Sequence, residues 1–179
     1  MDAAFLSKFK EDTESRWART KIAPNIYGFQ FQPGTKWNSG LSVRDIDQYE
    51  ELLGTTLPND FRLMLQHING TDRPNLNVYG SCGEPHRTTY RLYTYPRDLE
   101  IVREQIKVVQ EDREEIAEVL LEYEEFNLPT EATLFPIYGH RYLVCAPDRT
   151  KSRVLSVVGA DVITYGLCLQ DYLLREFLN

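Results

Sequence analysis

Residues 42–70 constrain the fold more than any other part of the chain. Apolar residues recur at helical spacing in two short runs, made of Ile46, Tyr49 and Leu53 and then of Phe61, Met64, Leu65 and Ile68. Gly54 offers the left-handed conformation that commonly ends a helix, and Pro58 is tolerated at a helix start, where the first N–H groups lack partners. The pattern predicts two amphipathic helices joined by a tight corner and closed by Asn69 and Gly70, the residue types that best accept a positive φ.

The composition is that of a globular protein of one folded unit. The chain has 179 residues, 42% of them hydrophobic and 26% charged, enough to bury about two-thirds of the unfolded surface. No window approaches the roughly 18 apolar residues of a membrane span, and the N-terminus lacks the uninterrupted apolar core of a signal peptide. Cys82, Cys145 and Cys168 are odd in number and far apart, which favours unpaired thiols in a reducing compartment. We therefore expect a soluble, cytoplasmic protein.

The negative charge is concentrated in one segment. Residues 111–125 contain eight acidic residues and one basic residue, a net charge of −7, which equals the net charge of the whole chain. The rest of the chain is therefore neutral overall. The pI near 5.0 and the lack of Lys and Arg clusters argue against nucleic-acid binding. The segment favours a protein partner with a basic surface.

The N-terminal region predicts a helix and a strand. Phe5, Leu6, Phe9 and Trp17 suggest an amphipathic helix over residues 4–18, and residues 26–32 favour a short strand. We assign residues 1–36 as an N-terminal extension and residues 37–179 as the main domain, together one compact unit. Trp37 is expected in the core or as a lid over the first helix of the 42–70 pair.

The remaining chain is rich in strands. Short runs of β-branched and aromatic residues separated by turn residues predict strands at 76–79, 87–95, 133–138, 142–146, 153–158 and 161–165. The spacing implies antiparallel hairpins, and residues 167–178 predict a closing helix. The predicted class is α+β, with a single antiparallel-dominated sheet and helices packed against it.

The acidic segment belongs to the longest helical pattern, which starts after Pro96. Its apolar stripe consists of Leu99, Val102, Ile106, Val109, Ile116, Leu120 and Tyr123, with Arg113 at the one missing apolar position. The pattern fits one helix over 97–125. It equally fits two helices with a kink near 110–112, since Asp112 and Glu115 resemble a capping box. Packing on the protein's own sheet is favoured over a coiled-coil dimer, so we expect a monomer or a weak dimer.

Residues 42–70 also resemble the signature of the SUKH superfamily, which includes fungal cell-wall-synthesis regulators and bacterial immunity proteins. The matching positions are Ile46, Tyr49, Glu50, Gly54, Leu57, Pro58, Phe61, Leu65, Asn69 and Gly70. Residues 134–137 and 169–178 also resemble the core strand and closing helix of the family, so the resemblance covers about residues 37–179. The chain departs from the family in the length and acidity of 98–125 and in its first 36 residues.

The resemblance implies a SUKH-like α+β fold and a non-catalytic protein that binds another protein. In bacteria this partner is most often a toxin, which the immunity protein neutralises; an intracellular scaffold or regulator of the same fold is the alternative. His67, His86 and His140 lie in no recognisable catalytic motif. Cys82 and His86 lack a second pair of ligands in the nearby sequence, so no metal or other cofactor is expected.

Two segments are the candidates for partner contact. The first is the acidic face, which can meet a basic cleft, and the second is an aromatic-rich turn between two predicted strands. The candidate residues are Glu111, Glu114, Glu115, Glu118, Glu122, Tyr138, His140, Arg141 and Tyr142. A solvated helix face and an ordinary hairpin end are the structural alternatives.

Overall fold

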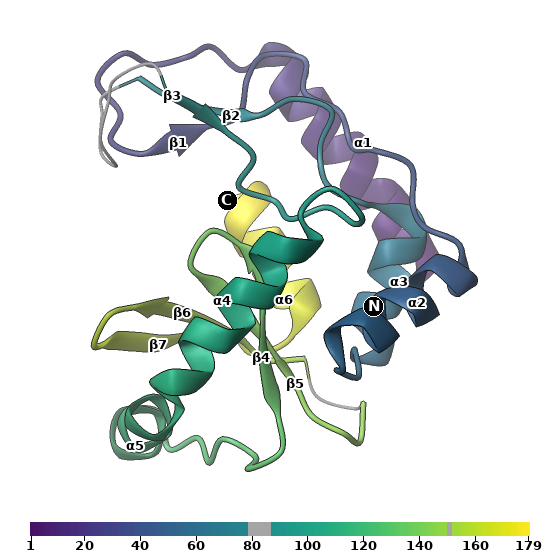
Figure 1. Ribbon diagram of the computed structural model, residues 1–179. Coiled ribbons are helices and arrows are strands. Elements are labelled where there is room, and N and C mark those ends of the chain that lie inside the picture. The colour runs from purple at the N-terminus through teal and green to yellow at the C-terminus, as the bar shows by residue number, and fades with distance from the viewer. Residues whose placement is uncertain (79–86, 150–151) are drawn as a thin grey trace.

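The computed structural model describes residues 1–78, 87–149 and 152–179 (Figure 1). These residues form six helices and seven strands. In chain order they are α1 (Ala3–Arg19), β1 (Phe29–Gln30), α2 (Val43–Leu53), α3 (Asn59–His67), β2 (Asn75–Asn77), β3 (Arg87–Thr89), α4 (Leu99–Glu111), α5 (Arg113–Glu124), β4 (Thr133–Tyr138), β5 (Arg141–Cys145), β6 (Val154–Val158), β7 (Asp161–Gly166) and α6 (Leu169–Phe177). The predicted α+β class is confirmed.

The strands form two antiparallel sheets instead of the predicted single sheet. Strands β4 to β7 follow one another in a four-stranded sheet, and β1, β2 and β3 form a smaller one. After Thr89 the chain leaves β2 and crosses to β4, where Leu92 and Tyr138 form an isolated bridge. The predicted strand at 87–95 is therefore much shorter, and the one at 26–32 shrinks to two residues. The Cys82 and His86 pair lies outside the described residues.

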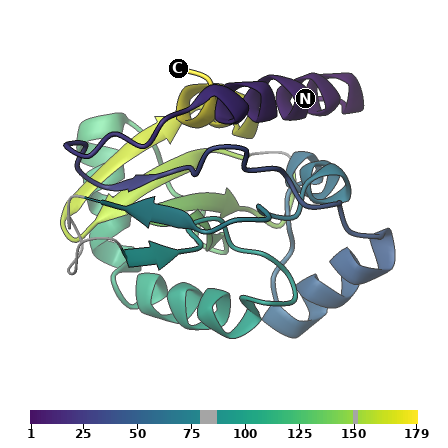
Figure 2. The same ribbon diagram turned by 90° about the horizontal axis from the view of Figure 1, so that it is seen from above.

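The strands β4 and β5 of the four-stranded sheet are buried on both faces. Residues of β4 and β5 alternate between two apolar clusters: Phe135 and Leu143 belong to one, and Leu134 and Val144 to the other, as the two-residue period of a strand requires. The first cluster includes side chains of α1, α2, α3 and α6 and Val102 of α4. The second includes those of α5 and the end of α4. Figure 2 shows α1 and α6 together on one side of the molecule, with α4 on the opposite side.

The N-terminal helix α1 shares the first cluster with α6. The Trp17 ring stacks on Phe31, with centroids 4.5 Å apart, and lies 5.0 Å from the Trp37 ring. Phe177 of α6 meets both tryptophan rings edge-on. The Trp37 indole N–H donates to the buried Thr13 hydroxyl at 2.7 Å, which satisfies the polar end of a buried ring. Trp37 is 7% exposed, so its predicted place in the core is confirmed.

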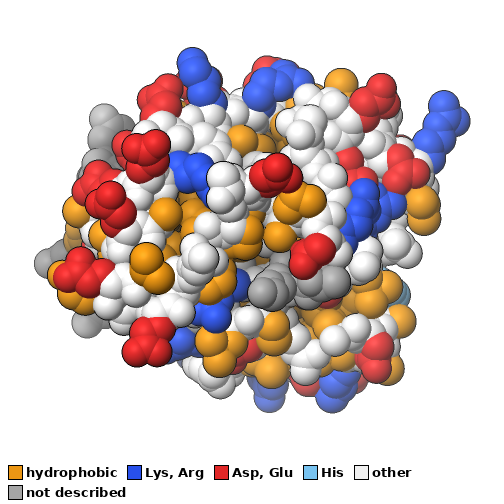
Figure 3. All heavy atoms as spheres, turned by 90° about the horizontal axis from the view of Figure 1, so that it is seen from below, with side chains coloured by type: hydrophobic (Ala, Val, Ile, Leu, Met, Phe, Trp, Pro, Cys, Tyr) orange, Lys and Arg blue, Asp and Glu red, His pale blue; other side chains and the backbone are white. Residues whose placement is uncertain are grey.

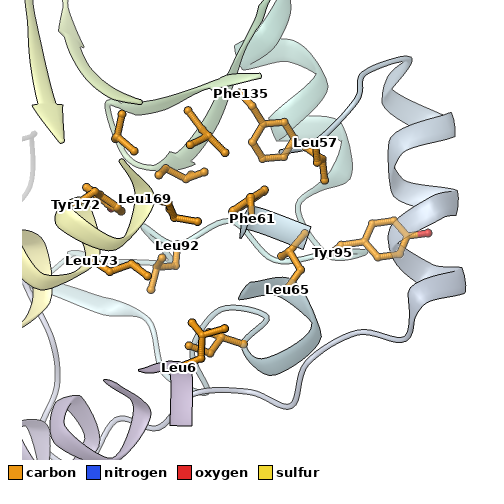
Figure 4. Close-up of a cluster of buried hydrophobic side chains, with 14 of the residues drawn as sticks. Leu6, Leu57, Phe61, Leu65, Leu92, Tyr95, Phe135, Leu169, Tyr172 and Leu173 are labelled. Atoms are coloured by element: carbon orange, nitrogen blue, oxygen red, sulfur yellow. The ribbon is translucent and has the colours of Figure 1, made fainter. Parts of the chain in front are cut away.

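The corner between α2 and α3 follows the local rules that predicted it. Ser42 caps α2, and the Asp45 side chain accepts back from the Ser42 N–H in a capping box. Gly54 ends α2 in the left-handed conformation, with φ 62°. Pro58 takes the N-cap position of α3. In Figure 4, side chains from α3, among them Phe61 and Leu65, lie near Tyr172 and Leu173 of α6 around Leu92.

Glu50 ties this corner to the four-stranded sheet. Its carboxylate accepts a hydrogen bond from the Leu57 N–H at 2.6 Å and pairs with Arg62 of α3. The same carboxylate lies 3.3 Å from the Arg149 guanidinium, in the connection between β5 and β6. The Glu50 side chain is only 12% exposed, so these partners compensate a carboxylate that has lost most of its water.

The end of α3 uses Asn69 differently from the prediction. Only Gly70 has a positive φ, 74°; Asn69 does not. Instead, the Asn69 side chain receives the Tyr95 N–H at 3.1 Å and donates to the Tyr95 carbonyl at 2.6 Å. Gly70 lies so close to this linker that an added Cβ would sit 2.0 Å from the Thr94 hydroxyl oxygen. Asn69 and Gly70 therefore join α3 to the segment that leads into α4.

The long helical pattern divides into α4 and α5 at Asp112. Asp112 is both the last cap of α4 and the first cap of α5, but its side chain makes no capping hydrogen bond, so the predicted capping box is wrong. Tyr123 is 72% exposed, although the stripe placed it inward. Of the stripe residues in α5, only Ile116 and Leu120 are buried.

Among the described helices, none combines the length and the apolar composition needed to cross a membrane.

Replacing Asn69 with alanine is expected to lower the free energy of unfolding by about 3 kcal/mol, because a buried N–H and a buried carbonyl of Tyr95 both lose their partner. Urea unfolding followed by circular dichroism measures this. Asn127→Ala, at an exposed loop position, is the control and is expected to change stability by less than about 0.5 kcal/mol. A loss below about 1 kcal/mol for Asn69→Ala would contradict the assigned role.

Candidate partner-binding surfaces

The predicted acidic face lies mainly on α5. Glu118 is two residues from both Ile116 and Leu120, so it points away from the buried side of the helix. Glu114 and Glu122 lie one turn to either side of Glu118, and all three are exposed. In Figure 3, acidic side chains gather along the left side of the molecule, where α5 lies in Figure 1. Glu115 is also exposed on α5, while Glu111 is exposed at the end of α4.

This acidic face is not neutralised within the described part of the chain. None of the five predicted glutamates forms an ion pair there. Arg113, the one base of the acidic segment, points instead to the loop before β4. Its guanidinium donates to the carbonyl oxygens of Ala132, at 2.8 Å, and Pro129. The negative charge of α5 therefore faces solvent without a cation.

Apolar side chains are exposed on the same helix. Leu121 is 58% exposed and Tyr123 is 72% exposed. Glu122 raises the pKa of Tyr123, first by accepting a hydrogen bond from its hydroxyl and then by its negative charge. An aromatic and an aliphatic side chain beside unpaired carboxylates give α5 the mixed character of a protein-binding surface.

A hollow of about 160 Å³ lies between α5 and the turn that joins β6 to β7. It is lined by Asp112, Glu115, Ile116, Gly159, Ala160 and Val162. Two carboxylates at its rim and apolar atoms in its wall suit the aliphatic chain and cationic end of Lys or Arg. Sequence reasoning missed this hollow because it joins segments far apart in the chain. The two small turn residues, Gly159 and Ala160, were its only sequence signal.

The predicted aromatic turn between β4 and β5 offers less surface than expected. Tyr142 is 7% exposed, faces α4 and donates to the Gln105 side chain at 3.0 Å. Tyr138 packs between the rings of Phe31 and Phe177. Burial raises the pKa of Tyr138. These two tyrosines thus stabilise the fold from inside.

The other two residues of the turn differ from each other. The Arg141 side chain is 12% exposed and pairs with Glu176 of α6 at 3.1 Å. Its guanidinium also lies 3.7 Å from the centroid of the Tyr165 ring. His140 is exposed. Of the four predicted turn residues, only His140 is exposed.

Within residues 1–78, 87–149 and 152–179, no three His, Cys, Asp or Glu side chains gather as metal ligands. Comparison of the chain with models of known protein families and with curated protein sequences finds no match.

Neutralising the centre of the acidic face is expected to stabilise the protein. Glu118 forms like-charge pairs four residues apart with both Glu114 and Glu122; each such pair costs about 0.2–0.5 kcal/mol. Glu118→Gln should therefore raise the free energy of unfolding by about 0.5–1 kcal/mol at low ionic strength. In about 1 M NaCl the gain should vanish, because the screening length falls to about 3 Å.

Urea unfolding at both salt concentrations measures this gain. The matched control is Glu131→Gln, at an exposed position with no acidic residue four places away, and no gain is expected there. A gain for Glu118→Gln that persists in high salt would show that charge repulsion is not its cause.

Proposed function

We propose that the protein binds a protein partner with a basic surface through α5, and that it is an immunity protein that neutralises a bacterial toxin by this binding. The observation that carries the proposal is the unpaired acidic face with exposed Leu121 and Tyr123. Such a surface attracts a basic cleft over a distance and supplies apolar contacts once the two proteins meet. The toxin part of the proposal rests on the resemblance of residues 42–70 to the SUKH signature.

The acidic face costs the free protein stability, which supports a role in binding. Glutamates one turn apart repel each other along α5, and Arg113 does not relieve them because it is bound to the loop before β4. A basic partner would remove this repulsion on contact. Its association would be fast at low salt and slower as salt screens the charges.

The hollow beside Ala160 gives the surface a specific point of attachment. A Lys or Arg side chain of the partner would place its aliphatic part against Ile116 and Val162 and its charge near Asp112 and Glu115. A few side chains that fill pockets commonly supply most of the binding energy of an interface. We therefore assign the hollow as the site for a basic anchor residue.

An intracellular scaffold or regulator with the same fold is the second candidate. It would use the same acidic face for a different basic protein. The two candidates differ in one expectation: only an immunity protein should protect cells from a toxin encoded beside it.

Co-expression with the product of the adjacent upstream gene tests the proposal. We expect the two proteins to co-purify and the growth defect caused by that product to disappear. Reversing three charges, Glu114→Lys, Glu118→Lys and Glu122→Lys, should lower the association rate at least about tenfold at low salt. Stopped-flow or surface-plasmon measurements at several salt concentrations give the rate.

A matched variant separates local charge from total charge. Glu11, Glu51 and Glu104 are exposed glutamates on α1, α2 and α4, and their reversal to lysine changes the net charge equally. We expect this control to keep most of the rate. If the protein neither protects cells nor co-purifies with that product, the immunity function is refuted. Equal losses of rate in the two triple variants would show that α5 is not part of the interface.

Filling the hollow tests the anchor separately. Ala160 is exposed in the β6–β7 turn, so Ala160→Phe should fill the hollow without unfolding the protein. We expect the dissociation constant for the partner to rise at least about tenfold, mainly through faster dissociation, because a central anchor is lost. Ala160→Ser, which leaves the space open, is the control. Unchanged affinity of Ala160→Phe would exclude the hollow as the anchor site.

A further inference from the structure

Arg91 lies in the linker that leads from β3 to α4, next to the β4–β5 turn. Its backbone is held on both sides: the Arg91 N–H donates to the side-chain oxygen of the buried Asn75 at 3.2 Å, and the Arg91 carbonyl accepts from the Gly139 N–H at 2.9 Å. These two hydrogen bonds, one to β2 and one to the β4–β5 turn, fix the backbone of Arg91.

The guanidinium group of Arg91 is also held in place. It lies over the Phe29 ring, with the central carbon 4.9 Å from the ring centroid. On the turn side it packs against Gly139, where an added Cβ would lie 2.1 Å from an Arg91 terminal nitrogen. Gly139 has φ 56°, so glycine serves both the turn and this close approach. The ring and the glycine together form a slot for the guanidinium group.

Among the described residues, this well-placed cation has no anion. Arg91 forms no ion pair or side-chain hydrogen bond with any described residue, although a guanidinium group carries five N–H donors. The neighbouring Arg141 is different, because it pairs with Glu176 and donates to the Ser156 hydroxyl at 2.7 Å. Arg141 therefore has its partners within the fold, whereas the guanidinium group of Arg91 has none among the described residues.

His140 indicates that the region is electropositive. The pKa of His140 is lowered from its ordinary value, first by partial burial and then by the positive charges of Arg141 and Arg91. Both charged groups that act on the ring are therefore cations. An anion bound at Arg91 would favour the charged imidazole and raise this pKa.

We propose that Arg91, held between Phe29 and Gly139, is a binding site for one carboxylate group of a partner protein, from an Asp or Glu side chain or a chain end. The planar fork of a guanidinium group matches a carboxylate with two parallel hydrogen bonds. A single free guanidinium group matches the single charge of a carboxylate better than the larger charge of a phosphate. This site is separate from the acidic face of α5 and does not depend on the proposed toxin.

NMR titration with sodium acetate tests the site, with sodium chloride exchanged to keep the ionic strength constant. We expect saturable shifts of the Arg91 side-chain N–H and of the Gly139 and His140 amides. The pKa of the His140 ring should rise with acetate. Inorganic phosphate is the second titrant and is expected to bind no more tightly than acetate at pH 6.

Four variants locate the effect. In Arg91→Gln we expect half-saturation at an acetate concentration at least about tenfold higher, and the His140 pKa should no longer rise when acetate is added. Arg91→Lys keeps the charge but loses the fork, and should weaken binding several-fold. Gly139→Ala should displace the guanidinium group. Gly159→Ala is its matched control, because Gly159 has φ 57° in the other hairpin turn and nothing near its Cβ position.

The expected order of acetate affinity is wild type equal to Gly159→Ala, then Arg91→Lys, then Gly139→Ala and Arg91→Gln. Amide spectra show whether each variant is folded. If Gly139→Ala does not fold, the result for Arg91→Gln alone tests the proposal. Shifts that do not saturate, or saturation that survives Arg91→Gln, would overturn the proposal. Phosphate binding at least tenfold tighter than acetate would overturn the carboxylate assignment.

Discussion

The two hydrogen bonds between the Asn69 side chain and the Tyr95 backbone hold the end of α3 to the linker that leads into α4. Tyr95 is buried, so its N–H and carbonyl need partners inside the protein. Because Asn69 supplies both partners, it fixes the end of α3 relative to the start of α4. Apolar packing alone tolerates sliding, whereas two short hydrogen bonds do not.

That position determines where both candidate binding surfaces lie. The linker after β3 carries Arg91 past the β4–β5 turn before it reaches Tyr95. Beyond it, α4 crosses the sheet and ends at Asp112, where α5 turns and presents its acidic face. The cationic slot at Arg91 and the anionic helix α5 therefore lie at the two ends of a segment that Asn69 fastens at Tyr95, close to the Arg91 end. The fold keeps surfaces of opposite charge apart, which prevents them from neutralising each other.

The sequence predicts the parts of this fold that depend on neighbouring residues. Gly54 marks the end of α2, and turn residues between short apolar runs mark the strands of the four-stranded sheet. The acidic face of α5 was predictable for the same reason, since the helical period alone separates its glutamates from Ile116 and Leu120.

Long-range geometry explains what could not be predicted. Tyr123 is exposed although it continues the apolar stripe, and Tyr142 is buried because α4 covers its face of the sheet. Arg91 looks like any surface arginine in the sequence, because Phe29 and Gly139 reach it from distant segments. The charge of the 111–125 segment has a consequence for the whole molecule. Since the remaining chain is neutral overall, the protein is an electric dipole with its negative pole at α5, and the field of a basic partner would turn it to face the right way before the two surfaces touch.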